Sequence, residues 1–228
     1  MLLLPILAAL LAQPVQPAES DSVSARACPA VTNTDLAAAI AAHGGAVRWA
    51  VEARAHPVTV WLQRRPTDAA SARHDAREWQ DALVAGVTAW SGVVPALRLA
   101  ITADSAAADV RVVWAPTLVT SPNDADAGAL ASLTAGRTTL VPDDAGRAVT
   151  ATVVLARTAP NGAPYLPRDV RAVTQHEIGH ALGLAHHASP SSVMAPMVTA
   201  EQIGETDRAV LRALYALPVG ACRPADGR

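Results

Sequence analysis

Residues 176–186 read HEIGHALGLAH and carry the strongest local signal in the chain. His176 and His180 stand four positions apart, so on a helix their imidazoles project from one face, a turn apart. Gly183 can take the left-handed conformation that ends a helix, after which the chain can turn and bring in His186. Three imidazoles at this spacing predict a tetrahedral Zn²⁺ site whose fourth position is left to water, as in catalytic zinc sites.

Glu177 stands next to the first histidine, where a carboxylate can take a proton from metal-bound water. The full pattern HExxHxxGxxH resembles the zinc signature of the metzincin metalloproteases. Met194 lies eight positions after His186, within the run Ser-Val-Met-Ala-Pro of residues 192–196. This run is similar to the methionine turn of the matrixin branch, the matrix-metalloprotease-like enzymes. The resemblance implies that the three histidines hold one catalytic Zn²⁺, that Glu177 is the catalytic carboxylate, and that Met194 packs beneath the ligands.

The resemblance covers roughly residues 46–217 and implies the α+β fold of the zincins. That fold has a twisted, mostly parallel sheet with an antiparallel edge strand, a long backing helix, the zinc helix, the methionine turn and a C-terminal helix. Alternating apolar and β-branched residues predict the strands, and helical periodicity predicts the helices. The expected strands cover residues 57–62, 97–101, 109–114, 138–141 and 148–155. The expected helices cover residues 35–43, 69–90, 168–184 and 201–217.

The expected helices carry features that can be checked residue by residue. Thr34 is expected to cap the first helix, and it stays open whether this helix belongs to the domain or to a removable pro-segment. Four apolar residues of the second helix recur at three- and four-residue intervals and predict a buried stripe, namely Trp79, Leu83, Val87 and Trp90. Ile178 and Leu182 lie about 200° around the zinc helix from the histidines, so we expect them to face the core.

Residues 138–141 and 148–155 flank a turn-rich segment and predict a hairpin. By the resemblance, one strand of this pair is the sheet edge above the active cleft. A peptide or protein substrate would add to that edge as a further strand and be recognised mainly through its main chain. Residues 138–141 are our candidate for this strand, with residues 130–134 as the alternative.

The amino-terminal residues predict export. An apolar run from Leu2 to Ala12 is too short to span a bilayer and precedes polar sequence, as in a signal peptide cleaved after Ala12 or Ala18. No Lys or Arg precedes the run, so an uncleaved anchor or a buried terminal helix is the alternative. The chain is therefore divided into a signal peptide (1–18), an N-terminal extension (19–45) and a matrixin-like metalloprotease domain (46–228). The expected location is extracellular or periplasmic, with no membrane anchor after cleavage.

Cys28 and Cys222 are the only two cysteines. Exported chains meet oxidising conditions, so we expect a disulfide between them. The alternative is a cysteine switch in which Cys28 blocks the zinc, although its Cys-Pro-Ala context lacks the Pro-Arg-Cys-Gly sequence of that switch in matrixins. A net charge of −2 without a basic cluster argues against a nucleic-acid partner, and we expect a monomer.

Two further places bear on metal binding. Residues 116–136 contain Asp124 and Asp126 but no histidine, so the structural zinc that matrixins often hold there is not expected. Asp124 or Asp126 could bind calcium, but we favour the alternative that they lie in a solvated turn. His187 directly follows the third histidine of the pattern. The family spacing selects His186 as the ligand and places His187 behind the ligands or at the surface, with His187 as ligand the alternative.

Together with the resemblance, these features predict a secreted zinc-dependent endopeptidase in which Glu177 assists the attack of zinc-bound water on a peptide bond. Two other classes stay open. The domain could hold zinc as a binding or inhibitory module without turnover, or it could hydrolyse a non-peptide bond. A cleft bordered by an exposed strand edge would favour a peptide, whereas a closed small pocket would favour the non-peptide substrate.

Overall fold

The computed structural model describes residues 30–66, 76–118, 135–159 and 161–222 of the chain. Its helices are α1 (Thr34–Ala42), the short 3₁₀ helix η1 (Val51–Ala53), α2 (Ala76–Thr88), α3 (Pro167–Ala181) and α4 (Glu205–Ala216). Its strands are β1 (Val58–Leu62), β2 (Leu99–Thr102), β3 (Val110–Ala115), β4 (Gly136–Pro142) and β5 (Ala148–Ala156). The strands form one sheet in the order β2-β1-β3-β5-β4, in which only β4 runs antiparallel to its neighbour. The predicted α+β fold with a mostly parallel sheet and an antiparallel edge strand is confirmed.

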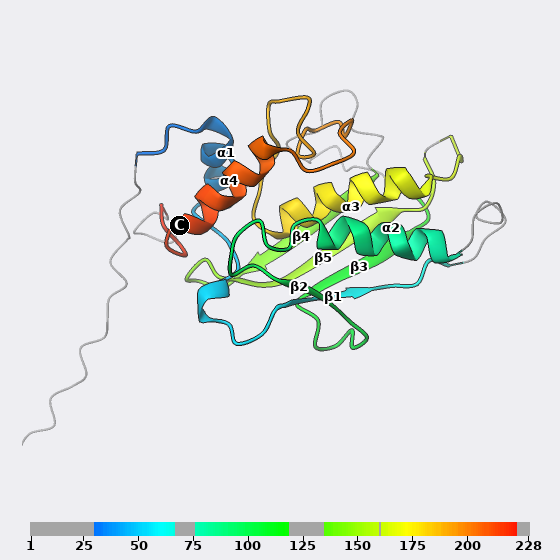
Figure 1. The fold of residues 1–228 in the computed structure, drawn as a ribbon, viewed down its shortest axis with the longest axis horizontal. Coiled ribbons are helices and arrows are strands. Elements are labelled where there is room, and N and C mark those ends of the chain that lie inside the picture. The colour runs from blue at the N-terminus through cyan, green and yellow to red at the C-terminus, as the bar shows by residue number, and fades with distance from the viewer. Residues whose placement is uncertain (1–29, 67–75, 119–134, 160, 223–228) are drawn as a thin grey trace, which may run out of the picture.

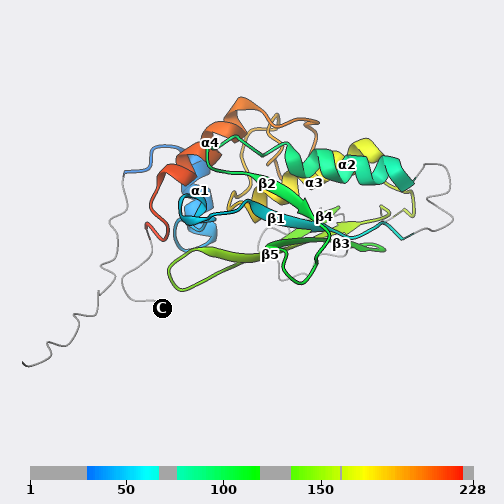
Figure 2. The ribbon, with the colours of Figure 1, turned by 60° about the horizontal axis from the view of Figure 1, so that its bottom comes forward.

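One face of the sheet is covered by helices. Val58, Val60 and Leu62 of β1 are buried while the residues between them are half-buried, which is the period-two pattern of a strand with one covered face. α2 and α3 lie side by side on that face, and the described residues place no helix on the other (Figure 1, Figure 2). α1 and α4 pack together at one end of the sheet (Figure 1).

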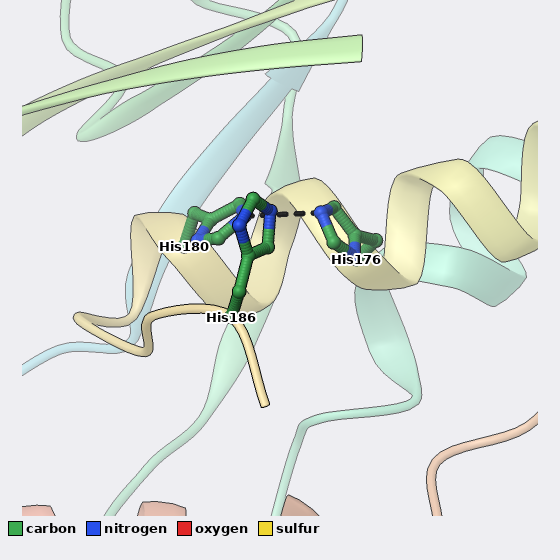
Figure 3. A group of neighbouring side chains, drawn as sticks. All are labelled: His176, His180 and His186. Carbon is green, nitrogen blue, oxygen red and sulfur yellow. Dashed lines mark hydrogen bonds between the residues drawn. The ribbon is translucent and has the colours of Figure 1, made fainter. Parts of the chain in front are cut away.

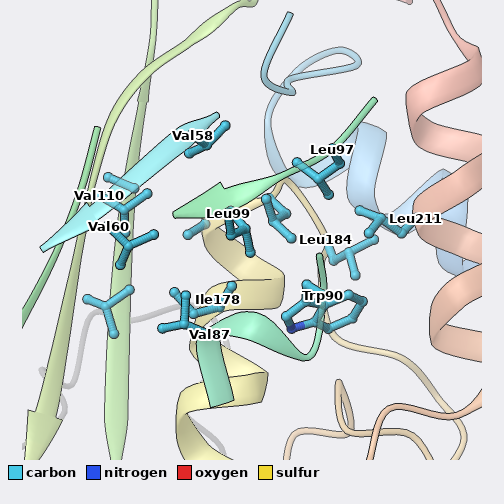
Figure 4. Close-up of a cluster of buried hydrophobic side chains, with 14 of the residues drawn as sticks. Val58, Val60, Val87, Trp90, Leu97, Leu99, Val110, Ile178, Leu184 and Leu211 are labelled. Carbon is cyan, nitrogen blue, oxygen red and sulfur yellow. The ribbon is translucent and has the colours of Figure 1, made fainter. Parts of the chain in front are cut away.

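The hydrophobic core lies between the sheet and the two covering helices. Figure 4 shows Val60 and Val110 on the covered face of the sheet, near Val87 of α2 and Ile178 of α3. All four belong to one buried cluster. The predicted stripe is confirmed, because all four of its members are buried: Trp79, Leu83, Val87 and Trp90. Burial of side chains of this size is the main favourable contribution to folding, so the stripe anchors α2 to the sheet.

α3 ends at Ala181, before the predicted end at Leu184. Gly183 has a φ of +98°, in the left-handed region, and a Cβ at this position would lie 2.2 Å from the carbonyl oxygen of Val47. A helix does not continue through a left-handed residue. The chain therefore leaves the helix axis at Gly183 and turns towards His186.

Two other helices also differ from their predicted bounds. α4 begins at Glu205 instead of Glu201, because the carboxylate of Asp207 accepts a hydrogen bond from the N–H of Gly204 at 2.8 Å and so caps the helix there. α2 ends at Thr88, two residues before the predicted end. The part of this predicted helix at residues 69–75 lies outside the described residues.

α1 is capped by Asn33, not by the predicted Thr34. The side-chain oxygen of Asn33 accepts a hydrogen bond from the N–H of Leu36 at 2.9 Å. Leu36 and Ala39 are buried where α1 packs against α4. Part of the predicted N-terminal extension (19–45) is therefore in contact with the domain that follows it, although the division of the chain stays a prediction.

Several predictions fall on residues outside the described ranges. These are the signal peptide (1–18), Cys28, Asp124 and Asp126, and the alternative edge strand at residues 130–134. The disulfide and the calcium site therefore stay predictions. In the part of the chain that the structure describes, no helix combines the length and the apolar character needed to cross a bilayer.

Candidate metal centre

Three histidines converge at the end of α3. His176 and His180 lie on successive turns of the helix, and His186 returns over them from the loop after Gly183 (Figure 3). One imidazole nitrogen of each histidine lies within 4.8 Å of those of the other two. The ring centroids of His180 and His186 are 4.9 Å apart. The structure thus brings the three predicted ligands within reach of a single ion.

Carbonyl groups set the tautomers of two of these histidines. His176 Nδ1 lies 2.7 Å from the carbonyl oxygen of Val193, and His180 Nδ1 lies 2.8 Å from that of Leu184. A carbonyl oxygen only accepts, so each Nδ1 carries the hydrogen and each Nε2 presents a lone pair. The two Nε2 atoms lie 3.0 Å apart, as the dashed line in Figure 3 marks. Two lone pairs at this distance repel each other unless a cation lies between them, so these nitrogens fit a metal ion.

Burial favours the neutral imidazole in two of these histidines, His176 and His180. His176 is buried, whereas His180 and His186 are half-buried, so the cluster as a whole is partly exposed. Loss of solvation lowers the pKa of His176 to about 4 and also lowers the pKa of His180 well below its ordinary value. Because a metal ion binds the neutral imidazole, this loss of solvation favours the form of His176 and His180 that can bind a metal.

The predicted methionine turn lies against the histidine-bearing helix. Met194 is fully buried, and its carbonyl oxygen accepts a hydrogen bond from the N–H of His187 at 2.8 Å. A Cβ at Gly179 would lie 2.3 Å from Sδ of Met194, so the methionine side chain packs directly against the main chain of α3 at this glycine. The turn also supplies the carbonyl group of Val193 that orients His176. It therefore supports the cluster by packing and by hydrogen bonding.

Two buried tryptophans fix the position of α3. Trp90 Nε1 donates to the carbonyl oxygen of Gln175 at 2.8 Å, and Trp49 Nε1 donates to that of Ala181 at 2.9 Å. Ala181 is the last residue of α3, where carbonyl groups lack partners within the helix. The two indoles thus hold the helix on either side of the residues that carry the cluster.

The side chain of Glu177 packs against β4. Thr138 Oγ1 donates a hydrogen bond to Oε2 of Glu177 at 2.7 Å. Gly136 leaves the space that the carboxylate occupies, because a Cβ there would lie 2.5 Å from Oε1. Burial raises the pKa of Glu177 to about 7, while the hydrogen bond from Thr138 and the charge of Arg137 act in the opposite direction. A carboxyl group with a pKa near neutrality can both accept and return a proton at neutral pH.

His187 is not part of the cluster. Its side chain is buried, and Nδ1 lies 3.0 Å from Oγ of Ser192 and 3.3 Å from the carboxylate of Asp207. The alternative that placed His187 at the surface is wrong, because the methionine turn and α4 cover it. Through these contacts His187 links the loop after α3 to the methionine turn and to α4.

The comparison with known families agrees with this geometry. The family model described as matrixin matches residues 59–216, more than half of the chain. The chain belongs to the matrixin family. Matrixins are zinc endopeptidases with a catalytic zinc, and the matched segment of this matrixin contains the whole three-histidine cluster. No curated protein matches the chain.

Three residues of this matrixin's site were missed at the level of sequence: Gly136, Thr138 and Asp207. Thr138 was expected in the edge strand, but nothing near it in the sequence assigns a role to its hydroxyl group. Gly136 precedes the expected strand and has no local signal either. Asp207 could have been found, because it stands three positions after Gly204, which is the spacing of a capping box.

Proposed function

We propose that this matrixin is a secreted zinc-dependent endopeptidase, with the three converging histidines as zinc ligands and Glu177 as the catalytic carboxylate. The observation that carries the proposal is the buried Glu177 beside two histidines whose Nε2 lone pairs face each other at 3.0 Å. Membership of the family supports hydrolysis of peptide bonds. Export is supported by the apolar run from Leu2 to Ala12 and by the extracellular location typical of matrixins.

The residues around the cluster each have a definable task. Zinc, when bound, lowers the pKa of water and polarises the substrate carbonyl group. The carboxylate of Glu177 accepts a proton from the attacking water, and a pKa of about 7 allows it to hold that proton. Glu177 then returns the proton to the leaving amine nitrogen as the peptide bond breaks. The carbonyl groups of Val193 and Leu184 keep the Nε2 atoms of His176 and His180 unprotonated.

The substrate would lie along β4. This strand is at the edge of the sheet, and no strand among the described residues pairs with its outer side. An extended peptide can add to such an edge through its main-chain N–H and C=O groups. Because Thr138 of β4 contacts Glu177, a peptide on this edge would pass next to the catalytic carboxylate.

The decisive experiment compares the native protein with Glu177→Gln on a mixed peptide library analysed by mass spectrometry. Gln has nearly the same shape but cannot accept the proton, so we expect cleavage about 10² to 10⁴ times slower in the variant. The variant should keep its zinc, because Glu177 is not among the histidine ligands. Metal content is measured in both proteins as the control for an intact site.

The other outcomes distinguish the alternatives. Equal cleavage by both proteins would remove Glu177 from the mechanism. Zinc retention without cleavage by either protein would favour a zinc-holding binding module or a hydrolase of a non-peptide bond. Small ester and amide substrates then separate these two, because only the hydrolase would turn them over.

A further inference from the structure

We infer that Thr138 and Gly136 of β4 position the carboxylate of Glu177 for proton transfer. The inference rests on the proposed function and extends it to two residues on a different element from the histidines. Thr138 and Gly136 stand two positions apart in the strand, so they share one face. That face meets α3, because Thr138 is paired with the buried Val153 of β5 and contacts Glu177 directly.

Thr138 contacts Glu177 at two atoms. Its Oγ1 lies 2.7 Å from Oε2 of the carboxylate and 2.9 Å from the main-chain carbonyl oxygen of the same residue. A threonine hydroxyl has one hydrogen, and a carboxylate is a stronger acceptor than a carbonyl group. The hydrogen bond therefore goes to the carboxylate, while the second contact places the hydroxyl against the backbone of α3. Movement of the hydroxyl away from the helix would break the bond to the carboxylate.

Gly136 acts by having no side chain. A Cβ at this position would lie 2.5 Å from Oε1, 2.6 Å from Cγ and 2.8 Å from Cδ of Glu177. Carbon atoms are not tolerated this close, so any larger residue would displace the carboxylate or the strand. The side chain of Glu177 is thus hydrogen-bonded to Thr138 and packed against the main chain of Gly136.

The same strand is the proposed binding edge for the substrate. A peptide paired with the outer side of β4 would take its position from the main chain of this strand, whose inward side chain at Thr138 holds Glu177. β4 would therefore position both the scissile bond of the substrate and the carboxylate of Glu177. A displacement of about 1 Å in a catalytic group can cost about 10²-fold in rate, so this arrangement affects turnover more than binding.

The first experiment measures kcat and KM for peptide cleavage by the full zinc-loaded chain. Thr138→Val keeps the shape of the side chain but removes the hydroxyl, and we expect kcat to fall about 10- to 100-fold with KM within about twofold. Thr138→Ser retains the hydroxyl and should recover most of the loss. Thr152→Val is the matched control, because Thr152 lies on β5 in register with Thr139 and is half-buried between the core residues Ala151 and Val153. It should leave both parameters unchanged.

Three kinetic results would overturn the inference. A native kcat in Thr138→Val would show that the hydrogen bond has no effect on turnover. Equal losses in the Val and Ser variants would assign the effect to packing instead of the hydroxyl. A change confined to KM would place Thr138 in substrate binding alone.

The second experiment does not depend on cleavage. Crystal structures of the zinc-loaded native protein, Thr138→Val and Gly136→Ala should show the carboxylate of Glu177 in one position in the native protein and displaced in both variants, with equal zinc content. An unmoved carboxylate in Thr138→Val would overturn the inference, and this variant alone decides if Gly136→Ala does not fold. If the native protein shows the expected carboxylate but cleaves no peptide, the proposed function fails while the positioning of Glu177 stands.

Discussion

At the scale of single residues, the carboxylate of Asp207 joins three parts of the chain around the histidines. Its Oδ2 accepts hydrogen bonds from the N–H groups of Gly204 at 2.8 Å and Val193 at 3.4 Å. Its Oδ1 accepts from the hydroxyl of Ser192 and lies 3.3 Å from Nδ1 of His187. A fully buried carboxylate is tolerated only when it is paired in this way. Asp207 therefore ties the start of α4 to the methionine turn and to the loop after α3.

Replacement of Asp207 by Asn is expected to lower the free energy of unfolding by about 3 kcal/mol. Asn carries no charge, and its NH₂ group cannot accept the hydrogen bonds that Asp207 receives. Urea denaturation of the zinc-free protein measures the loss. Glu205→Gln in the same helix is the control, expected to cost less than about 1 kcal/mol because the Glu205–Arg212 ion pair is exposed. Equal losses in the two variants would contradict this prediction.

The Asp207→Asn variant also has an expected pH signature. Burial acts to raise the pKa of Asp207, but hydrogen bonds from His187, Ser192 and two main-chain N–H groups outweigh burial and lower the pKa below its ordinary value of 3.8. Because the pKa of Asp207 is lower in the folded state, the stability that its ionised carboxylate contributes is complete above the unfolded-state pKa. This stability is lost as the pH falls through the folded-state pKa. The stability difference between native and variant proteins should therefore narrow below pH 3.8. A difference that stays constant there would count against the assignment.

At the scale of elements, the turn after α3 decides whether His186 reaches the other two histidines. Gly183 adopts a φ of +98° in this turn. A Cβ there would lie 2.2 Å from the carbonyl oxygen of Val47 and 3.1 Å from Cδ2 of Leu214. At Gly183, both the positive φ and the contact with Val47 therefore disfavour any residue with a side chain.

We expect Gly183→Ala to cost at least about 2 kcal/mol of stability and to weaken zinc binding, because the loop that carries His186 must shift. Gly44→Ala is the matched control. Gly44 also has a positive φ, of +61°, but no atom lies within 4 Å of a Cβ built there, so only the backbone cost of about 1 kcal/mol applies. Urea denaturation and zinc titration against a chelator measure both effects. Identical behaviour of the two variants would show that the contact with Val47 does not restrict the turn.

At the scale of the whole molecule, α1 packs against α4 at one end of the sheet (Figure 1). Leu36 of α1 belongs to the same buried cluster as Leu211 of α4. The carboxylate of Asp35 accepts a hydrogen bond from the N–H of Ala188 at 3.3 Å, which joins α1 to the loop after the third histidine. These contacts favour a helix that stays with the folded domain over a removable pro-segment.

Leu36→Ala in the full chain tests this arrangement. The side chain of Leu36 is 7% exposed, so its truncation should leave a cavity and cost about 2 to 3 kcal/mol in urea denaturation. Val149→Ala is the control, because Val149 is 49% exposed and its truncation should cost less than about 0.5 kcal/mol. A cost for Leu36→Ala as small as that of the control would support the pro-segment alternative.

The spacing of residues along the chain was enough to predict the histidine cluster and most of the elements. His176 and His180 converge because a helix repeats every 3.6 residues, and His186 joins them because Gly183 ends that helix. The buried stripe of α2 and the five strands follow from equally local periods. All these features depend on residues that are close together in the sequence, so their patterns can be recognised in a single sequence.

Tertiary structure alone decided the surroundings of Glu177 and the contact of Asp207 with the methionine turn. Thr138 is 39 positions from Glu177, and the hydrogen bond between them exists because the pairing of β4 with β5 places that strand over α3. Asp207 is 14 positions from Val193, and it reaches the methionine turn only because α4 packs beside that turn. Contacts between distant segments depend on strand register and helix packing, which leave no periodic trace in one sequence.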